Sequence, residues 1–433
     1  STPAIIGTVV TALYNIIDSV VIGHAIDDPN VVSGIAVTFP VMNLATALGM
    51  LIGAGAATRI SIVMGQNDKK QAELILGNSI LLTLIIGALY MSAFAIWIDP
   101  LLHLFGASAN SLPYAREFLL WVLPGMVLIN VTFSYNNVMR ATGYPKKAML
   151  SSMLSVGCNL VLAPIFIFVF DWGIRGAAFA TLLSQSVALV WVLHHFLDKK
   201  TYIRFHRSTL KLRKRIVKQI FSIGMSPFIM NVCACCIVIF INYQLLSHGD
   251  DYSVGAFGII NRVQMLFVMI VMGIAQGMQP ITGYNFGAGL VDRARRSVQL
   301  GIAAGCTMTT LGFVLAVFFP GMLVGMFTDS TLLVEQASKA LSISMLSFPV
   351  VGAQIIICQF FQSIGKAFIA IFLSLSRQLL FLLPGLALLP VWMGVDGVWT
   401  SMPVSDFLAT VAAVVMFVYQ IRKFRRKAAV TTI

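Results

Sequence analysis

Long apolar segments separated by short polar loops run through this whole sequence. Of its 433 residues, 58% are hydrophobic and 10% are charged, whereas soluble domains carry about 25% charged residues. Segments of this length cross the roughly 30 Å hydrocarbon core of a bilayer as helices, because a helix satisfies its own backbone polar groups. We therefore predict an all-α polytopic membrane protein. Its twelve predicted transmembrane segments are approximately 3–25, 33–64, 73–98, 114–141, 147–170, 175–196, 219–246, 253–284, 294–319, 334–363, 367–391 and 398–421.

The positions of the charges predict the topology. The net charge is +13, which could suggest nucleic acid, but the basic residues lie in short loops rather than along one polar face. They gather after every second segment and in the C-terminal tail, whereas the alternate loops hold acids. This is the positive-inside pattern, so both termini are expected to be cytoplasmic and no nucleic-acid partner is expected. We interpret the basic stretch 198–218 as a solvated linker near anionic lipid headgroups.

The two halves of the chain resemble each other. Gly65 matches Gly287 and Gly143 matches Gly365 at one offset of 222 residues, and the stretch 172–176 matches 393–397 with a one-residue slip. Each half holds six segments, an even number, so the repeats are parallel about an axis along the membrane normal. We predict two pseudo-symmetric six-helix lobes, suited to alternating access. The expected parts are an N-terminal lobe 1–197, a basic cytoplasmic linker 198–218, a C-terminal lobe 219–421 and a basic cytoplasmic tail 422–433.

Few charged side chains fall inside the segments. Asp18 lies well within the first segment, with Tyr14 on the same helical face. A charge at the bilayer centre costs about 2.5–3.5 kcal/mol, so Asp18 is predicted to be a proton or sodium site facing a protein-lined cavity. Arg377 and Asp406 are the other charged side chains predicted to lie within the membrane, where an unpaired charge is costly. We expect them to pair with each other for structural reasons. Four neutral amides are candidates for lining a substrate cavity: Asn43, Asn136, Gln276 and Gln354.

Motifs for enzymes and bound cofactors are absent from the sequence. It contains no Walker-type phosphate loop and no Ser/His/Asp constellation, and its six histidines fall near the ends of the segments. The closely spaced Cys233, Cys235 and Cys236 lack a second cluster at ligand spacing, so packing is the better interpretation. We expect no enzyme activity, no cofactor and no structural metal.

Several strings together resemble the multidrug and toxic compound extrusion (MATE) family. They are Leu-Tyr-Asn-Ile-Ile-Asp at 13–18 followed by Gly23, Gly-Gln-Asn-Asp at 65–68, Arg-Ala-Thr-Gly at 140–143, Gly-Ala-Ala-Phe-Ala-Thr at 176–181, and Gln-Pro at 279–280 with Tyr-Asn-Phe-Gly-Ala at 284–288. Each string alone is weak, but the ordered set covers essentially the whole chain. The last string looks most like bacterial branches near the MepA and DinF groups.

This resemblance implies a V-shaped twelve-helix exporter in the bacterial cytoplasmic membrane. Such a protein uses a proton or sodium gradient to expel organic cations and other amphipathic compounds. The family's ion site would comprise Asp18, Asn159, an acid at position 163 and Thr181. Here position 163 is Ala163, before Pro164. The missing carboxylate leaves sodium one anionic ligand fewer, which favours proton coupling or impaired coupling.

Alternative functions differ in the residues they require. A lipid-linked oligosaccharide flippase of the same wider superfamily would carry more basic charge in its cavity, where the candidates here are neutral or acidic. A lipid-modifying membrane enzyme would need clustered His, Asp or Ser at a membrane edge, and a channel does not need the repeats. We therefore expect a monomeric, lipid-embedded antiporter of small cationic or amphipathic substrates, with H⁺ or Na⁺ as the coupling ion.

Overall fold

The computed structural model describes residues 2–10, 29–105, 111–170, 172–198, 201–249, 251–328 and 330–431. Every regular element within these ranges is a helix, which confirms the expected all-α class. Ten of the described helices are long and apolar enough to cross a membrane, or up to eleven if one bent pair counts as a single span. Most of the predicted first segment, including Tyr14 and Asp18, lies outside the described residues.

The chain divides into two compact units. The N-terminal unit is Ile6–Asn231, and the C-terminal unit is Val232–Ile433 together with Ser1–Ile5. The division falls within one continuous helix, α8 (Lys214–His248).

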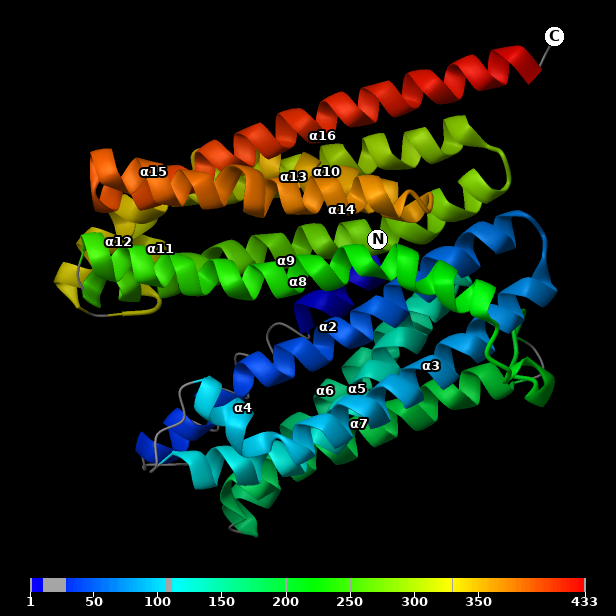
Figure 1. Cartoon of the computed structure of the whole chain (residues 1–433), viewed down its shortest axis with the longest axis horizontal. Coiled ribbons are helices and arrows are strands. Elements are labelled where there is room, and N and C mark those ends of the chain that lie inside the picture. Colours follow the sequence, from blue (N-terminus) through cyan, green and yellow to red (C-terminus); the bar gives the residue numbers. More distant parts are fainter. Residues whose placement is uncertain are drawn as a thin grey trace. The chain divides into compact units, whose positions relative to one another are not determined.

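The N-terminal unit is a bundle of long helices. Among its helices, α2 packs on α3 and α5, and α7 packs on α5 and α6 (Figure 1). Its described elements are α2 (Pro29–Gly65), α3 (Lys69–Ile96), α4 (Ile98–Leu104), α5 (Leu112–Ala141), α6 (Pro145–Pro164), the π-helix η1 (Ile165–Val169), α7 (Gly173–Leu197), the 3₁₀ turn η2 (Arg207–Thr209) and the first part of α8.

Glycines let α2 and α8 cross at backbone contact within the N-terminal unit. A Cβ added at Gly224 would lie 1.6 Å from the Leu51 carbonyl oxygen, and one at Gly55 would lie 2.2 Å from the Ile220 carbonyl oxygen. Small residues at helix crossings are the usual means of close packing in a membrane, where lipid removes the hydrophobic drive for helices to associate.

The basic linker packs on the N-terminal unit. Ile203 is only 1% exposed and belongs to a core cluster with residues of α2, α3 and α5. The Arg213 backbone N–H donates to Asn78 Oδ1 of α3 at 2.8 Å, and the Thr209 carbonyl lies against Gly77. The prediction of a solvated linker was therefore wrong for its middle part, because an apolar anchor and backbone hydrogen bonds hold that part to α3.

The C-terminal unit is a second helical bundle. Figure 1 shows α9, α10, α13 and α16 running alongside one another, and the contacts of α13 with α9, α10 and α16 agree. Its elements are the rest of α8, then α9 (Asp251–Gly287), α10 (Val291–Phe318), α11 (Pro320–Gly325), α12 (Thr331–Ser344), α13 (Phe348–Ser363), α14 (Ala367–Leu375), the π-helix η3 (Ser376–Leu382), α15 (Leu383–Met393) and α16 (Val395–Thr431).

The segment predicted as one helix at 334–363 is broken. It consists of α12 and α13, which are bent by 55° at the break. Pro349 lies at the start of α13, where it cannot donate a hydrogen bond to the preceding turn and disfavours a helical conformation just before it. The proline therefore explains why α12 ends and a new helix begins.

Candidate functional site

Two of the residues expected to form the ion site meet inside the N-terminal unit. Asn159 Nδ2 on α6 donates a hydrogen bond to Thr181 Oγ1 on α7 at 3.1 Å. Thr181 Oγ1 in turn donates to the Ala177 carbonyl oxygen one turn back, also at 3.1 Å. The Asn159 residue is 3% exposed. A buried amide and a half-buried hydroxyl are therefore held in fixed orientations between two helices. The side-chain oxygen of Asn159, Oδ1, remains as an acceptor for a further ligand.

Position 163 lies one turn beyond Asn159 on the same buried face of α6. Ala163 is 4% exposed and packs in an apolar cluster with Ile167, Ala177 and Ala180. Directly after it, Pro164 ends α6 and the chain continues as a π-helix. Single-turn π segments often occur at functional sites, and here the segment adjoins the place where the family's second acid is expected.

The acid itself lies outside the described residues. Asp18 and Tyr14 both fall in the stretch 11–28, so their placement beside Asn159 stays a prediction. What the described residues provide is the α6–α7 part of the expected site: Asn159, Thr181 and the small side chain of Ala163.

The four amides predicted to line a substrate cavity differ in their surroundings. Asn43 on α2 is exposed, and Gln276 on α9 is half-buried. Asn136 on α5 is 6% exposed, and its Oδ1 has no hydrogen-bond partner among the described residues. Gln354 on α13 is 5% exposed and donates to Cys358 Sγ at 3.5 Å. Asn43 and Asn136 belong to the N-terminal unit and the two glutamines to the C-terminal unit, so a shared cavity stays a prediction.

Arg377 and Asp406 meet in the C-terminal unit. Arg377 Nε, on the π-helix η3, donates to Asp406 Oδ1 on α16 at 2.7 Å. The Asp406 side chain is 10% exposed and that of Arg377 is 36% exposed. A near-buried carboxylate with a short charge-assisted hydrogen bond has its charge compensated locally, as the structural interpretation of this pair requires.

Among the interhelical ion pairs that the sequence did not reveal, two are related by the repeat. In the N-terminal unit, Arg175 at the start of α7 donates to Glu117 near the start of α5. In the C-terminal unit, Lys339 Nζ on α12 lies 2.8 Å from Asp396 Oδ2 at the start of α16. The repeat offset of 222 residues relates Glu117 to Lys339, and the slipped offset relates Arg175 to Asp396. The two pairs are thus repeat equivalents with their charges exchanged, a relation that charge patterns at the repeat offset could have revealed.

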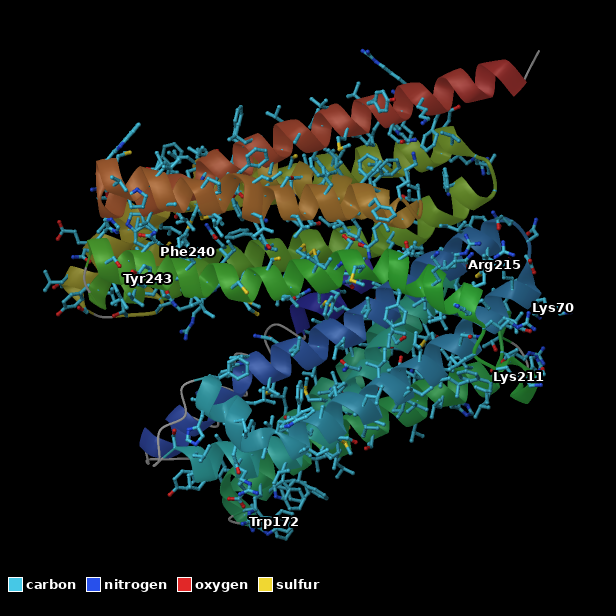
Figure 2. All side chains as sticks on the ribbon, viewed as in Figure 1. Lys70, Trp172, Lys211, Arg215, Phe240 and Tyr243 are labelled. Carbon is cyan, nitrogen blue, oxygen red and sulfur yellow. The ribbon has the colours of Figure 1, made fainter. Side chains whose placement is uncertain are left out.

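Another contact that the sequence did not reveal lies at the basic end of the N-terminal unit. Lys147 Nζ on α6 is 3.1 Å from His195 Nδ1 on α7, and the His195 residue is 4% exposed. Figure 2 shows Lys70, Lys211 and Arg215 gathered at this unit's basic end, with Trp172 at the opposite end.

Within the described ranges, no three His, Cys, Asp or Glu side chains come together as a metal site would require.

The comparisons with known proteins decide the family. The family model described as MatE matches residues 3–165 and 227–386. This chain belongs to the MatE family. Multidrug export protein MepA of Staphylococcus aureus (strain N315) is 26% identical over 424 residues, covering 98% of this chain and 92% of that protein. This MatE chain is therefore similar over nearly its full length to the branch that its sequence strings indicated.

Solved structures share the fold of this MatE protein. An outward-facing multidrug resistance MATE family transporter of the MOP superfamily superimposes with a TM-score of 0.92 at 24% identity, covering 98% of this chain and 95% of that one. A MATE crystal structure in the straight conformation gives 0.93 at the same identity and coverage. The predicted twelve-helix MATE fold is thereby confirmed. Members of this family are transporters rather than enzymes, and the long apolar helices make this a multi-pass membrane protein.

Proposed function

We propose that this protein is a secondary active multidrug exporter that moves organic cations or amphipathic drugs against H⁺ or Na⁺ by alternating access. The observation that carries the proposal is the interhelical, partly buried hydrogen bond from Asn159 to Thr181. These are the two residues that the family resemblance assigns to the ion site from α6 and α7. The name of the MepA relatives supports drugs as the substrate class.

Asp18 is the group that exchanges the coupling ion in this mechanism. A bound cation neutralises it, and Asn159 and Thr181 supply neutral oxygens or a hydrogen-bond donor beside it. Loss of the cation restores a negative charge that attracts an organic cation, so one acid serves ion and substrate in turn. One monovalent cation crossing about 150 mV provides roughly 3.5 kcal/mol, enough to sustain a substrate gradient of a few hundred-fold without ATP.

The surroundings of position 163 favour the proton as the coupling ion. Sodium needs several oxygen ligands around it, whereas a proton needs a single acceptor. Ala163 offers no ligand and packs with other apolar side chains. With one carboxylate in place of two, protonation of Asp18 remains possible while sodium loses an anionic ligand.

The charge distribution supports an orientation with both termini in the cytoplasm. Lys70, Lys211 and Arg215 gather at one end of the N-terminal unit (Figure 2), and basic residues stay on the cytoplasmic side of membranes. At the opposite end, Phe166 stacks on Trp172 at 5.4 Å, and aromatic side chains concentrate at membrane interfaces. We propose a monomer in the bacterial cytoplasmic membrane.

Reconstitution in proteoliposomes tests this function. A fluorescent organic cation such as ethidium is loaded, and a proton gradient and a sodium gradient are imposed separately. We expect gradient-driven movement of the dye, stronger with protons, and its loss in Asp18→Asn protein that still inserts and remains monodisperse. Ser152→Ala is the matched control, because that hydroxyl only donates to the Ala148 carbonyl of its own helix. An absence of transport under both gradients would rule out antiport.

A further inference from the structure

The buried face of α6 carries a series of polar side chains that leads away from Asn159. The buried residues of this helix are Ala148, Ser151, Ser155, Asn159 and Ala163. Their spacing of three and four residues keeps them on one face, and successive members four apart are separated by about 6 Å along the axis. Two hydroxyl groups therefore continue, within the interior of the bundle, from the Asn159–Thr181 hydrogen bond towards the basic end of the unit.

Contacts with α7 mark both ends of this series. At one end Asn159 donates to Thr181, and at the other end Lys147 Nζ lies 3.1 Å from His195 Nδ1. The α6–α7 interface thus begins at the proposed ion site and finishes at a buried imidazole beside the basic linker.

Two buried polar atoms, one on α6 and one on α7, have no protein partner among the described residues. Ser151 is 0% exposed and His195 is 4% exposed, yet Ser151 Oγ and His195 Nε2 form no hydrogen bond within the described part of the chain. Buried polar groups are ordinarily paired with protein or with ordered water, and orphans call for an explanation. A packing stripe of small residues needs neither group, so these two atoms indicate a small polar ligand such as water in the interior of the unit.

The contact with Lys147 fixes the tautomer of His195. An ammonium group has three donors and no acceptor, so His195 Nδ1 must accept from Lys147. The hydrogen of the neutral ring is then on Nε2, the atom without a partner. His195 consequently contacts the charged lysine through Nδ1, while its protonated Nε2 is buried.

We propose that Ser155, Ser151 and His195 form the route by which the coupling proton passes between the Asn159–Thr181 site and the basic end of the N-terminal unit. This inference rests on the proposed antiport and on the proton as its coupling ion. Each hydroxyl accepts a proton on a lone pair while it gives up its own hydrogen to the next member or to a bridging water. The two serines are therefore unchanged after each transfer.

The transfer of a proton from His195 to the aqueous phase also conserves the number of protons. A proton arrives on Nε2 while the hydrogen on Nδ1 passes to the neutral amine of Lys147, which leaves the ammonium and the Nε2–H tautomer. Lys147 then loses one proton to the aqueous phase, and tautomer exchange of the ring restores the starting state. One proton enters and one leaves, and no other group changes its charge.

Other groups near the imidazole set the background for any pH dependence. From α6, Lys147 contacts the ring, and the ring of Tyr144 lies 4.6 Å from it. From the end of its own helix, His194 and Asp198 act on it electrostatically. Because four titratable groups surround His195, the test depends on the loss of relay atoms rather than on a pH optimum.

The experiment compares Ser151→Ala, Ser155→Ala and His195→Gln with wild type in proteoliposomes. Ser152→Ala on α6 and Ser186→Ala on α7 are matched controls, because both hydroxyls donate to carbonyls of their own helices. Two activities are measured: ethidium export driven by a proton gradient, with internal pH recorded at the same time, and ethidium–ethidium exchange without a gradient. Thermal unfolding in detergent shows whether each variant is folded.

We expect the three route variants to lose about a hundredfold of proton-driven export and proton uptake, the low end of what a positioned acid–base group contributes. Their dye exchange and the two controls stay at wild-type levels. Route variants that behave like Ser152→Ala would overturn the proposal, as would equal losses of export and exchange in folded protein. If the wild-type protein moves dye only with a sodium gradient, the proton route is wrong but antiport stands. If the wild-type protein is inactive under both gradients, the proposed function itself is contradicted.

Discussion

Arg377 on η3 and Asp406 on α16 are joined by a 2.7 Å hydrogen bond between Nε and Oδ1. The bond links the middle of one predicted transmembrane segment to the last one. Thr410 also donates its hydroxyl to the Asp406 carbonyl oxygen at 2.7 Å, so this stretch of α16 is held from both the side chain and the backbone.

Removing one member of this pair is expected to destabilise the C-terminal unit. Arg377→Ala leaves the Asp406 carboxylate, 10% exposed, without its partner, and an uncompensated buried charge typically costs about 3–5 kcal/mol. Asp406→Ala should cost less, because the Arg377 side chain that it leaves unpaired is 36% exposed. The double variant removes both charges and should recover part of that loss. Thermal unfolding of purified protein in detergent measures the effect. If the double variant is no more stable than the worse single variant, the two residues do not act as a pair.

The exposed pair Lys339–Asp396 provides the comparison. Its side chains are 66% and 44% exposed, and exposed ion pairs contribute about 0–1 kcal/mol. Lys339→Ala should therefore change the unfolding midpoint far less than Arg377→Ala. Equal effects would show that burial does not set the strength of these pairs.

The exchanged charges of the two repeats lead to a second prediction. Glu117→Lys with Arg175→Asp gives the N-terminal unit the polarity that Lys339 and Asp396 have in the other unit. Because the geometry tolerates either polarity, the double reversal should keep stability within about 1 kcal/mol of wild type. Each single reversal places like charges together and should be the less stable form. The readout is a double-mutant cycle on unfolding midpoints, and a coupling energy of zero would contradict it.

The sequence predicted what depends on hydropathy and on residue identity. The length of the apolar segments predicted the helices. The resemblance of the motif strings to the MATE family assigned Asn159 and Thr181 to one ion site. The break between α12 and α13 was missed although Pro349 signalled it, because hydropathy alone does not register a bend. The docking of Ile203 was missed for another reason: one apolar residue within a basic stretch looks solvated until its tertiary neighbours are known. Likewise, nothing in the sequence pairs His195 with Lys147, since their contact depends on how α6 and α7 are aligned.

Ile203 should hold the linker against the N-terminal unit. Ile203→Ala removes a 1% exposed side chain from the core cluster, and such truncations cost about 2–5 kcal/mol. The local part of that loss should appear as faster tryptic cleavage at the basic residues of the linker, followed by mass spectrometry. Leu212→Ala is the control, because Leu212 is 48% exposed. Equal cleavage rates for both variants would mean that Ile203 does not anchor the linker.

Ala163→Asp tests how position 163 selects the ion. The acid would enter an apolar cluster containing Ile167, Ala177 and Ala180, so we expect lower thermal stability in the absence of a cation. Added sodium should restore part of that stability, because a second carboxylate provides the anionic ligand that the wild type lacks. Dye transport should then respond more strongly to a sodium gradient. Ala163→Ser is the uncharged control, and an unaltered response to sodium in Ala163→Asp would show that this position does not select the ion.

The crossing of α2 and α8 should depend on Gly224 having no side chain. A Cβ at this position would lie 1.6 Å from the Leu51 carbonyl oxygen, and backbone cannot move aside as a flexible side chain does. Gly224→Ala must therefore separate the two helices, disturbing the contact of Ile220 with the core cluster that contains Ile52. We expect loss of folded protein, or a fall in stability beyond about 1–3 kcal/mol, the usual cost of overpacking. Gly157→Ala on α6 is the matched control, because nothing lies within 4 Å of the added methyl group and alanine favours a helix by about 1 kcal/mol over glycine. Size-exclusion profiles and unfolding midpoints compare the two, and a stable, monodisperse Gly224→Ala protein would show that the helices do not cross at backbone contact.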